Sequence, residues 1–169
     1  QASKSTPTAA VASFASTGKK GKRKDLARIA ISYQNAYVAQ VSLGANQNQL
    51  VKALKEASEY NGPSIVICYA PCISHGIKTG MENSINLEKL ATDSGFFPIF
   101  RYHPNNGFTL DSKNVNYDLI DEFINNQTRF TSLDVVNKDN ANKLKEKLKD
   151  SIKENYNYYI NLEKLYEQE

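Results

Sequence analysis

The segment spanning residues 37–70 constrains the fold most, because it has the pattern of a strand, a helix and a second strand. Residues 37–44, YVAQVSLG, alternate and are rich in β-forming side chains, which predicts a strand. Residues 46–63 carry a helical apolar stripe that ends at a Gly-Pro pair. Residues 64–70, SIVICYA, form a continuous apolar run, which is typical of a strand buried on both faces in a parallel sheet. The segment therefore predicts a right-handed βαβ unit in a protein of the α/β class.

Further elements follow from the same periodicities. Thr6 as N-cap and Pro7 as first helical residue predict a helix that stops near Gly18. Asp25 is expected to cap a second short helix. The remaining predictions are a helix at 84–94, a short strand at 96–104 interrupted by Pro98, turns at 104–117, and helices at 117–126 and 139–167.

Three of these helices carry apolar stripes that predict their buried faces. The stripes consist of Leu26, Ile29 and Ala30; of Leu50, Leu54 and Ala57; and of Leu144, Leu148, Ile152, Tyr159, Leu162 and Tyr166. We expect the last helix to pack back on the domain, with a coiled coil as the alternative.

Composition excludes several classes of protein. The chain has 169 residues, 40% apolar and 23% charged, which indicates one globular domain rather than a disordered segment. No apolar run approaches the roughly 20 residues that cross a bilayer, so no membrane partner is expected. A net charge of +3 is too small to imply a nucleic-acid partner. Two cysteines are too few for a disulfide scaffold in a chain of this size, so a reducing compartment is expected.

Cys72 is the residue whose position points most directly to chemistry. Pro71 cannot donate to a strand ladder, so the strand should end by Ala70. Cys72 then lies just beyond the carboxyl end of a parallel strand, the edge where open α/β sheets bind ligands. A thiolate there could bind a metal or an iron–sulfur cluster, while a half-buried structural thiol is the alternative. One cysteine pair cannot supply the four thiolates of a [4Fe–4S] cluster, so the chain cannot hold such a cluster alone.

Other reactive side chains carry weaker signals. Cys68 lies within the strand and is expected to pack in the core. His75 and His103 are too separated to complete a zinc site with the two cysteines. The basic run at 19–24 is expected to be a solvated loop, although contact with phosphates or with an acidic electron carrier stays open. The chain has no nucleotide-binding glycine motif and no nucleophile elbow, and we assign no catalytic residue.

A long stretch carries a family resemblance. Residues 6–81, from TPTAAV to APCISHGIKTGM, closely resemble the last domain of the pyruvate:ferredoxin (flavodoxin) oxidoreductases without a gap. The likeness continues more loosely through LEKLATDSGFFPIFRYHP and FTLDSK to the C-terminal helix. It therefore covers most of the chain.

The resemblance implies a fold and an extent. It implies a partial thiamine-diphosphate-binding fold, with a parallel sheet flanked by helices, as a C-terminal fragment that ends in a long helix. Residues 1–135 would be the C-terminal portion of the thiamine-diphosphate-binding domain, and residues 136–169 a C-terminal helical extension. A start at Gln1 without an initiator methionine also indicates a fragment or a processed chain.

The resemblance also implies an activity and cofactors. The family oxidatively decarboxylates pyruvate to acetyl-CoA and CO2, using thiamine diphosphate and Mg2+, and passes electrons through [4Fe–4S] clusters to ferredoxin or flavodoxin. Cys72 would be the fourth ligand of the cluster nearest the thiamine, with three ligands upstream of this chain. The diphosphate and Mg2+ ligands would also lie upstream, and residues 1–6 would continue the cofactor loop. The fragment alone is expected to be inactive.

Several alternatives stay open. The parent enzyme could be a related 2-oxoacid:ferredoxin oxidoreductase or a pyruvate:NADP oxidoreductase, which a flavin and nicotinamide module after Glu169 would identify. A more distant alternative is a non-enzymatic binding module that uses the basic run and the charged C-terminal helix. Expected partners are ferredoxin or flavodoxin, the substrates pyruvate and coenzyme A, the rest of the parent enzyme and a second copy in a homodimer. Anaerobic metabolism in the cytoplasm is expected, or a hydrogenosome-type organelle if the source is a protist.

Overall fold

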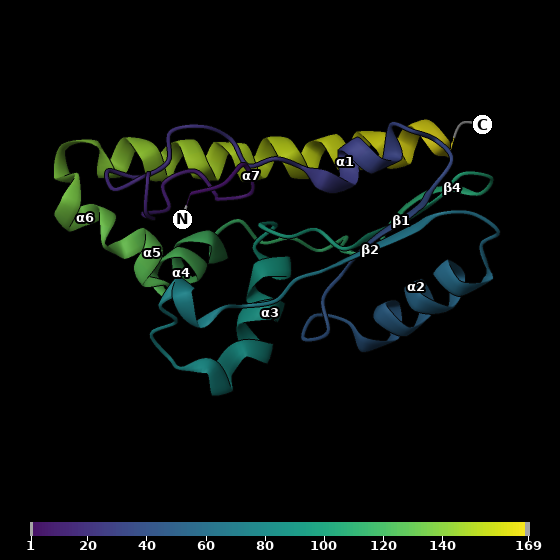
Figure 1. Cartoon of the computed structure of the whole chain (residues 1–169), viewed down its shortest axis with the longest axis horizontal. Coiled ribbons are helices and arrows are strands. Elements are labelled where there is room, and N and C mark those ends of the chain that lie inside the picture. Colours follow the sequence, from purple (N-terminus) through teal and green to yellow (C-terminus); the bar gives the residue numbers. More distant parts are fainter. Residues whose placement is uncertain (1, 168–169) are drawn as a thin grey trace.

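The fold is an open four-stranded sheet with helices on both faces (Figure 1), seen in a computed structural model that describes residues 2–167. The strands are β1 (Tyr37–Val41), β2 (Ser64–Cys68), β3 (Phe100–His103) and β4 (Gly107–Leu110), in the order β2-β1-β3-β4. The helices are α1 (Leu26–Ile31), α2 (Gln47–Glu59), α3 (Ser84–Asp93), α4 (Leu119–Asn125), α5 (Thr128–Thr131), α6 (Leu133–Val136) and α7 (Lys138–Tyr166), with 3-10 turns η1 (Ile73–His75) and η2 (Met81–Asn83). In Figure 1, α2 lies on one side of the sheet, α1 and α7 lie on the other, and α3 to α6 extend past its end.

The predicted βαβ unit is present, and the α/β class with a long terminal helix is confirmed. β1 and β2 pair in parallel from Tyr37↔Ser64 to Val41↔Cys68, with α2 as the crossover. The other two pairings, β1 with β3 and β3 with β4, are antiparallel, so the sheet is mixed rather than parallel throughout. β4 lies within the stretch predicted as turns, because the three residues between His103 and Gly107 close a hairpin. Gly107 has φ +80°, the left-handed conformation that ends such a loop.

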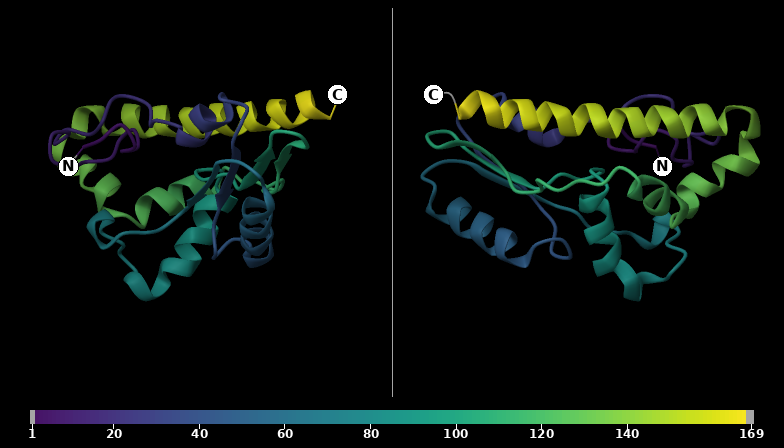
Figure 2. Two further views of the ribbon diagram at one scale, coloured as in Figure 1. Left: turned by 45° about the vertical axis from the view of Figure 1, so that its right-hand side comes forward. Right: turned by 180° about the vertical axis from the view of Figure 1, so that it is seen from behind.

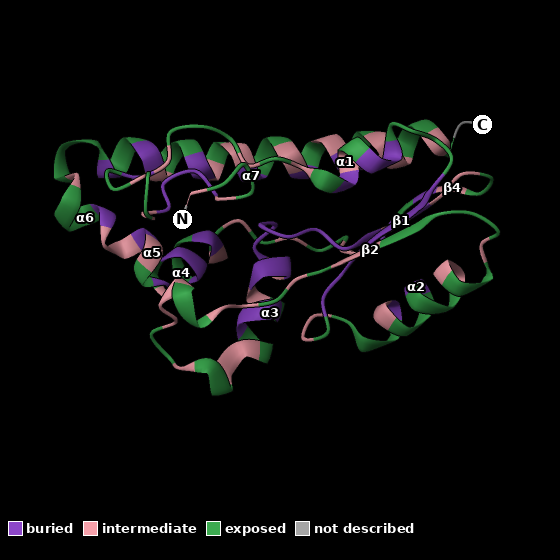
Figure 3. Ribbon diagram, viewed as in Figure 1, coloured by how far each residue is buried: buried purple, intermediate pink, exposed green. Residues whose placement is uncertain are grey.

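The strand buried on both faces is β1 rather than β2. Every residue of β1 is buried, while β2, the edge strand, is exposed or half-buried along its length (Figure 3). The prediction of full burial for SIVICYA was therefore wrong, and so was core packing for Cys68, which is exposed. An apolar run identifies a strand, but the order of strands in the sheet decides how many of its faces are covered.

The helix predicted between Thr6 and Gly18 is absent, and these residues form successive turns. Ala9 and Phe14 have φ +67°, which no right-handed helix allows. The amide of Ala9 donates to the Lys19 carbonyl oxygen at 2.9 Å, and the Lys19 amide donates to the Ala10 carbonyl oxygen at 3.0 Å. These hydrogen bonds pair the backbone of Ala9 and Ala10 with Lys19, and both alanines are buried. Tertiary contacts therefore override the helix propensity of the alanines.

Asp25 caps α1 as predicted, with its Oδ1 accepting from the Arg28 amide at 2.9 Å. The buried face is rotated from the predicted stripe. Ala27, Ala30 and Ile31 are buried, whereas Leu26 and Ile29 are each 46% exposed. Small alanines face inward because they allow α1 to pack closely against the sheet and α7.

The long helix α7 packs along the domain for its whole length (Figure 2), as predicted. Its buried residues are Ala141, Leu144, Leu148, Ile152, Tyr156 and Tyr159. The Tyr159 hydroxyl donates to Asp25 Oδ2 at 2.7 Å, and the Tyr156 hydroxyl donates to the Ser112 carbonyl oxygen at 2.6 Å. None of the helices in residues 2–167 combines the length and apolar character that spanning a membrane requires.

Candidate functional site

Cys72 lies beyond the carboxyl ends of the parallel strands β1 and β2, where the sequence predicted it. The pairing of the strands ends at Val41↔Cys68, and the Tyr69 amide donates to the Val41 carbonyl oxygen at 3.0 Å. After Pro71 the chain turns, and Cys72 precedes η1 in an extended conformation, φ −129° and ψ 140°. The side chain is half-buried, so its sulfur remains accessible at this edge of the sheet.

The surroundings of Cys72 favour the thiolate over the thiol. Hydrogen bonds from the Ser74 amide and hydroxyl are the main cause that lowers the pKa of Cys72. The positive charge of Arg129 and the amide of His75 act in the same direction. A thiolate that accepts amide hydrogen bonds is the form of cysteine that binds metals.

Arg129 stands on the short helix α5 and carries the charge that lowers the pKa of this thiol. Its guanidinium lies 4.8 Å from the centroid of the Phe130 ring, and its buried Nε has no hydrogen-bond partner. Within residues 2–167, no carboxylate lies at ion-pair distance from it. Burial lowers the pKa of Arg129 to about 10, so the side chain still carries its charge at neutral pH. That charge is therefore not cancelled by an acidic neighbour and acts on Cys72.

The loop after Cys72 is fixed to the segment that carries Arg129. The Thr128 amide and hydroxyl donate to the Gly76 carbonyl oxygen at 2.8 and 2.9 Å. Ile77 pairs with Gln127 in an isolated antiparallel bridge. Gly76 has φ +66°, and a Cβ there would lie 2.5 Å from the Thr128 Cβ, so no larger residue fits. These contacts fix the loop that follows Cys72 against the segment that carries Arg129.

The two histidines lie in different places. His75 borders the Cys72 loop, and burial together with the Arg129 charge lowers its pKa to about 4, so its ring is neutral at pH 7. His103 ends β3 and packs against the rings of Tyr37 and Tyr60. It lies where β1 begins, at the end of the sheet opposite to Cys72. Within the described chain, no three His, Cys, Asp or Glu side chains gather where they could hold a metal ion. A cluster bound at Cys72 would therefore need further ligands from outside the described residues.

Lys19 and Arg23, two residues of the basic run at 19–24, make contacts within the domain, although a solvated loop was predicted. Lys19 Nζ donates to the carbonyl oxygens of Ser3, Lys4 and Thr6 at 2.8, 3.0 and 2.6 Å. Arg23 lies over the Phe96 ring, 4.9 Å from its centroid. The prediction of a solvated loop was therefore wrong for Lys19 and Arg23.

Sequence reasoning missed Ser74 and Arg129. Neither residue stands in a recognisable motif, and Arg129 reaches Cys72 only because the fold pairs the segment after η1 with the start of α5. The proximity of Ser74 to Cys72 along the chain was the one local signal available.

Comparison with known proteins gives a consistent set of relatives, although no protein-family model matches the chain. A mitochondrial "pyruvate dehydrogenase [NADP(+)]" of Euglena gracilis is 42% identical over 165 residues, or 94% of this chain. A pyruvate-flavodoxin oxidoreductase of Klebsiella pneumoniae is 45% identical, and a pyruvate:ferredoxin oxidoreductase of Moorella thermoacetica 47%, each over 139 residues or 79% of the chain. The chain spans only 9% to 12% of the length of these relatives.

Over most of its length, the chain is therefore similar to a part of relatives that are named as oxidoreductases or dehydrogenases of pyruvate. More particularly, it is related to a segment of the pyruvate-flavodoxin and pyruvate:ferredoxin oxidoreductases. The resemblance drawn from residues 6–81 is thereby confirmed.

Proposed function

We propose that this chain is part of a larger pyruvate:ferredoxin or pyruvate-flavodoxin oxidoreductase and supplies Cys72 as a ligand of a [4Fe–4S] cluster. The observation that carries the proposal is the position of Cys72 at the carboxyl edge of a parallel strand pair, with Ser74 and Arg129 favouring its thiolate. The enzyme would convert pyruvate and coenzyme A to acetyl-CoA and CO2 and transfer the electrons to ferredoxin or flavodoxin.

The donor set at Cys72 fits a shared cluster. A [4Fe–4S] cluster takes four thiolates, and hydrogen bonds to a ligating sulfur tune its reduction potential. Cys72 would be the ligand from this chain, and Ser74 favours its thiolate form. The cluster, when bound, accepts electrons singly. Three further thiolates would come from other parts of the larger enzyme.

Thiamine diphosphate and Mg2+ complete the proposed cofactors, with their ligands outside this chain. Residues 1–6 were predicted to continue the cofactor loop. Gln1 lies outside the described residues, and Ser3 to Thr6 form a turn in which the Ser3 amide donates to Thr6 Oγ1 at 2.9 Å. Lys19 holds this turn through three carbonyl oxygens, so the segment is well placed to support a neighbouring loop.

The exposed edge of the sheet supports a role within a larger assembly. β2 presents unpaired backbone groups along one side, and such edges are commonly covered by a further strand or segment. We propose that the rest of the enzyme, or the second subunit of a homodimer, covers this edge. The division of the chain at residues 135 and 136 stays a prediction, as does its inactivity in isolation.

The electron acceptor and the compartment stay open within this class. Relatives from Euglena gracilis and Cryptosporidium parvum are both named "pyruvate dehydrogenase [NADP(+)]", so NADP+ is the alternative acceptor. A cytoplasmic location is proposed, or a hydrogenosome-type organelle in a protist. The non-enzymatic binding module is disfavoured because Lys19 and Lys22 of the basic run are engaged by other groups of the chain.

The test is anaerobic, coenzyme-A-dependent reduction of a viologen dye by pyruvate, measured on the full-length enzyme together with its iron content. Cys72→Ser should lose iron and turnover, whereas the matched control Cys68→Ser, an exposed thiol on β2, should keep both. Supplying ferredoxin, flavodoxin or NADP+ in place of the dye identifies the acceptor. Equal iron and equal turnover in Cys72→Ser would remove Cys72 from the ligand set.

A further inference from the structure

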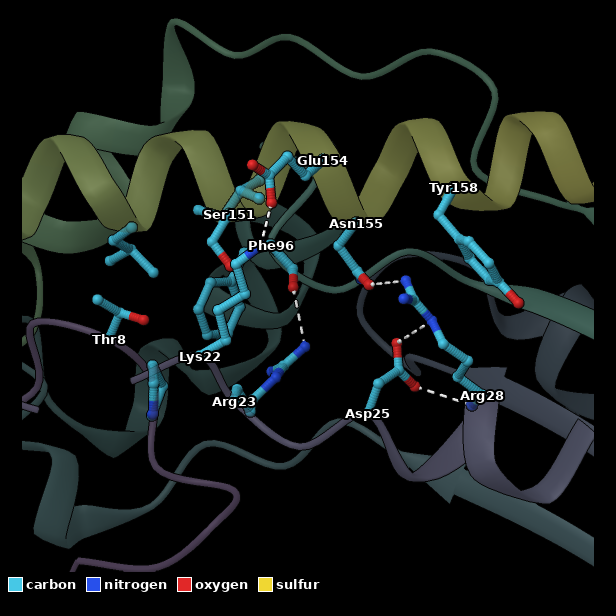
Figure 4. Close-up of a pocket in the computed structure, with 13 residues that line it drawn as sticks. Thr8, Lys22, Arg23, Asp25, Arg28, Phe96, Ser151, Glu154, Asn155 and Tyr158 are labelled. Carbon is cyan, nitrogen blue, oxygen red and sulfur yellow. Dashed lines mark hydrogen bonds and ion pairs between the residues drawn. The ribbon is translucent and has the colours of Figure 1, made fainter. Parts of the chain in front are cut away.

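A second candidate site, whose lining does not include Cys72, lies between the N-terminal segment and α7 (Figure 4). It is a pocket of about 350 Å³, which is within the range of small-molecule sites. Its lining residues are Pro7, Thr8, Lys22, Arg23, Asp25, Arg28, Phe96, Leu148, Ser151, Ile152, Glu154, Asn155 and Tyr158. None of these residues takes part in the contacts that fix the Cys72 loop.

Arg23 is the cation in this pocket that makes no ion pair among the described residues, and Asp25 is the acidic group whose charge acts on it from a longer distance. Its Nη2 reaches only the Phe96 carbonyl oxygen, at a long 3.4 Å, and among residues 2–167 no carboxylate lies at ion-pair distance from it. The other two cations are engaged, because Lys22 pairs with Glu154, and Arg28 Nη2 donates to Asn155 Oδ1 at 2.9 Å. Burial is the main cause that lowers the pKa of Arg23. A guanidinium so placed favours an anion beside it.

Two further donors stand near Arg23 on α7. Figure 4 shows Ser151 pointing from the helix toward the side of the pocket where Lys22 and Arg23 lie. Asn155 accepts from Arg28 through its Oδ1, which leaves its amide nitrogen as a donor. The polar side of the pocket is therefore rich in donors, and the carboxylates of Asp25 and Glu154 are already occupied by other partners.

The floor of the pocket is apolar. Phe96, Leu148 and Ile152 are 4% to 5% exposed and form part of the main hydrophobic cluster. The Phe96 ring has the Arg23 guanidinium 4.9 Å from its centroid. A ligand that contacted both the donors and the apolar floor would therefore carry an oxyanion attached to a small apolar group.

We propose that this pocket binds a small organic oxyanion, a carboxylate or a phosphate ester, whose charged end pairs with Arg23 and whose apolar body rests on Phe96 and Ile152. Arg23 supplies two parallel N–H groups to the oxyanion, as guanidinium does for carboxylate and phosphate. Ser151 adds a third donor from α7. This inference does not depend on the cluster or on the proposed reaction.

The test is isothermal titration calorimetry of the full-length protein with phenyl phosphate, with benzoate and with neutral benzyl alcohol. At least one of the two anions should bind more tightly than benzyl alcohol, and the tighter anion identifies the ligand chemistry as phosphate or carboxylate. Arg23→Gln should weaken that anion about tenfold or more, since a charge-assisted pair is lost. The matched control Lys24→Gln removes a neighbouring charge outside the pocket and should leave binding unchanged.

Three results would overturn the proposal: no binding by either anion, equal binding by benzyl alcohol, or equal affinity in Arg23→Gln. Circular dichroism checks that Arg23→Gln is folded. If it is not, Ser151→Ala decides, because Ser151 lies on one face of a long helix and alanine preserves that helix. Weaker anion binding in Ser151→Ala supports the site, and unchanged anion binding overturns it.

Discussion

The carbonyl oxygen of Gly76 accepts two hydrogen bonds from Thr128, one from its amide at 2.8 Å and one from its hydroxyl at 2.9 Å. The two residues are 52 positions apart in the chain, since Gly76 follows η1 and Thr128 begins α5. This contact is what brings the Cys72 loop against the helix that carries Arg129. The packing of the Cys72 loop against α5 therefore depends on Gly76 and Thr128, which are not themselves candidate ligands.

Gly76→Ala should destabilise the protein by about 1–3 kcal/mol, because alanine is strained at φ +66° and its Cβ would meet the Thr128 Cβ at 2.5 Å. Urea unfolding measures the change. The matched control is Gly21→Ala, where an added Cβ meets nothing within 4 Å and φ lies outside the strained region. A loss in Gly76→Ala no larger than in Gly21→Ala would contradict the role of this contact.

Arg129→Met should raise the pKa of the Cys72 thiol, because it removes a positive charge that favours the thiolate. The measurement is the rate of alkylation by iodoacetamide against pH, in iron-free protein on a Cys68→Ser background. With Arg129 present, the midpoint should fall below the ordinary value of 9.0, since the pKa of Cys72 is lowered. Arg129→Lys keeps the charge and should keep most of the effect. An unchanged midpoint in Arg129→Met would show that the charge of Arg129 has no part in lowering the pKa of Cys72.

Arg101 holds two carboxylates on the far side of the sheet from α7. Its Nη2 and Nε donate to Asp111 Oδ1 and Oδ2 at 2.9 and 3.0 Å, and its Nη1 donates to Glu56 Oε1 at 2.7 Å. Arg101→Met should cost about 3 kcal/mol at pH 7, because both carboxylates lose their counter-charge in a largely buried site. Lys52→Met is the control, since Lys52 is exposed and lies 4.0 Å from Glu56 Oε1.

The same network gives a pH dependence of stability. Burial raises the pKa of Glu56, but hydrogen bonds from Arg101 and Tyr37 outweigh it, so the net pKa lies below 4.5. A lowered carboxyl pKa contributes stability that is present above 4.5 and is lost as pH falls through the folded-state value. The difference in unfolding free energy between wild type and Arg101→Met should therefore shrink on acidification below that pH. A difference that stayed constant down to pH 3 would contradict this role for Glu56.

Tyr159→Phe should destabilise the protein by roughly 1.5–3 kcal/mol, because it removes the hydroxyl that donates to Asp25 Oδ2 at 2.7 Å. That bond links α7 to the residue that caps α1. Tyr158→Phe is the neighbouring control: the Tyr158 ring lies 3.5 Å beneath the Arg28 guanidinium, and phenylalanine preserves this stacking. Thermal or urea unfolding should show a loss in Tyr159→Phe that is absent in Tyr158→Phe.

Much of the fold could be predicted because its signals are local. The parallel pair β1 and β2 with its crossover helix, the Asp25 cap and the buried stripe of α7 all depend on residues within a few positions of one another. Pro71 marked the end of β2 for the same reason, so Cys72 was placed at the correct edge of the sheet.

The predictions that were wrong share a different cause, because contacts between separate segments decided those structures. The alanine-rich stretch after Pro7 favours a helix by propensity, but its backbone pairs with Lys19 instead. SIVICYA forms a strand as its composition predicts, yet it stands at the edge, because strand order depends on where β3 and β4 attach. The hairpin that joins those strands also made their pairing antiparallel.

The sequence by itself determined where strands and the long helix form, and which cysteine follows the parallel strand, because periodicity, caps and proline act over a few residues. Only the tertiary structure decided that the charge of Arg129 acts on Cys72 and that Arg23 lines a pocket under α7. Those contacts join segments far apart in the chain. They arise from the packing of the whole core, which no local pattern of side chains specifies.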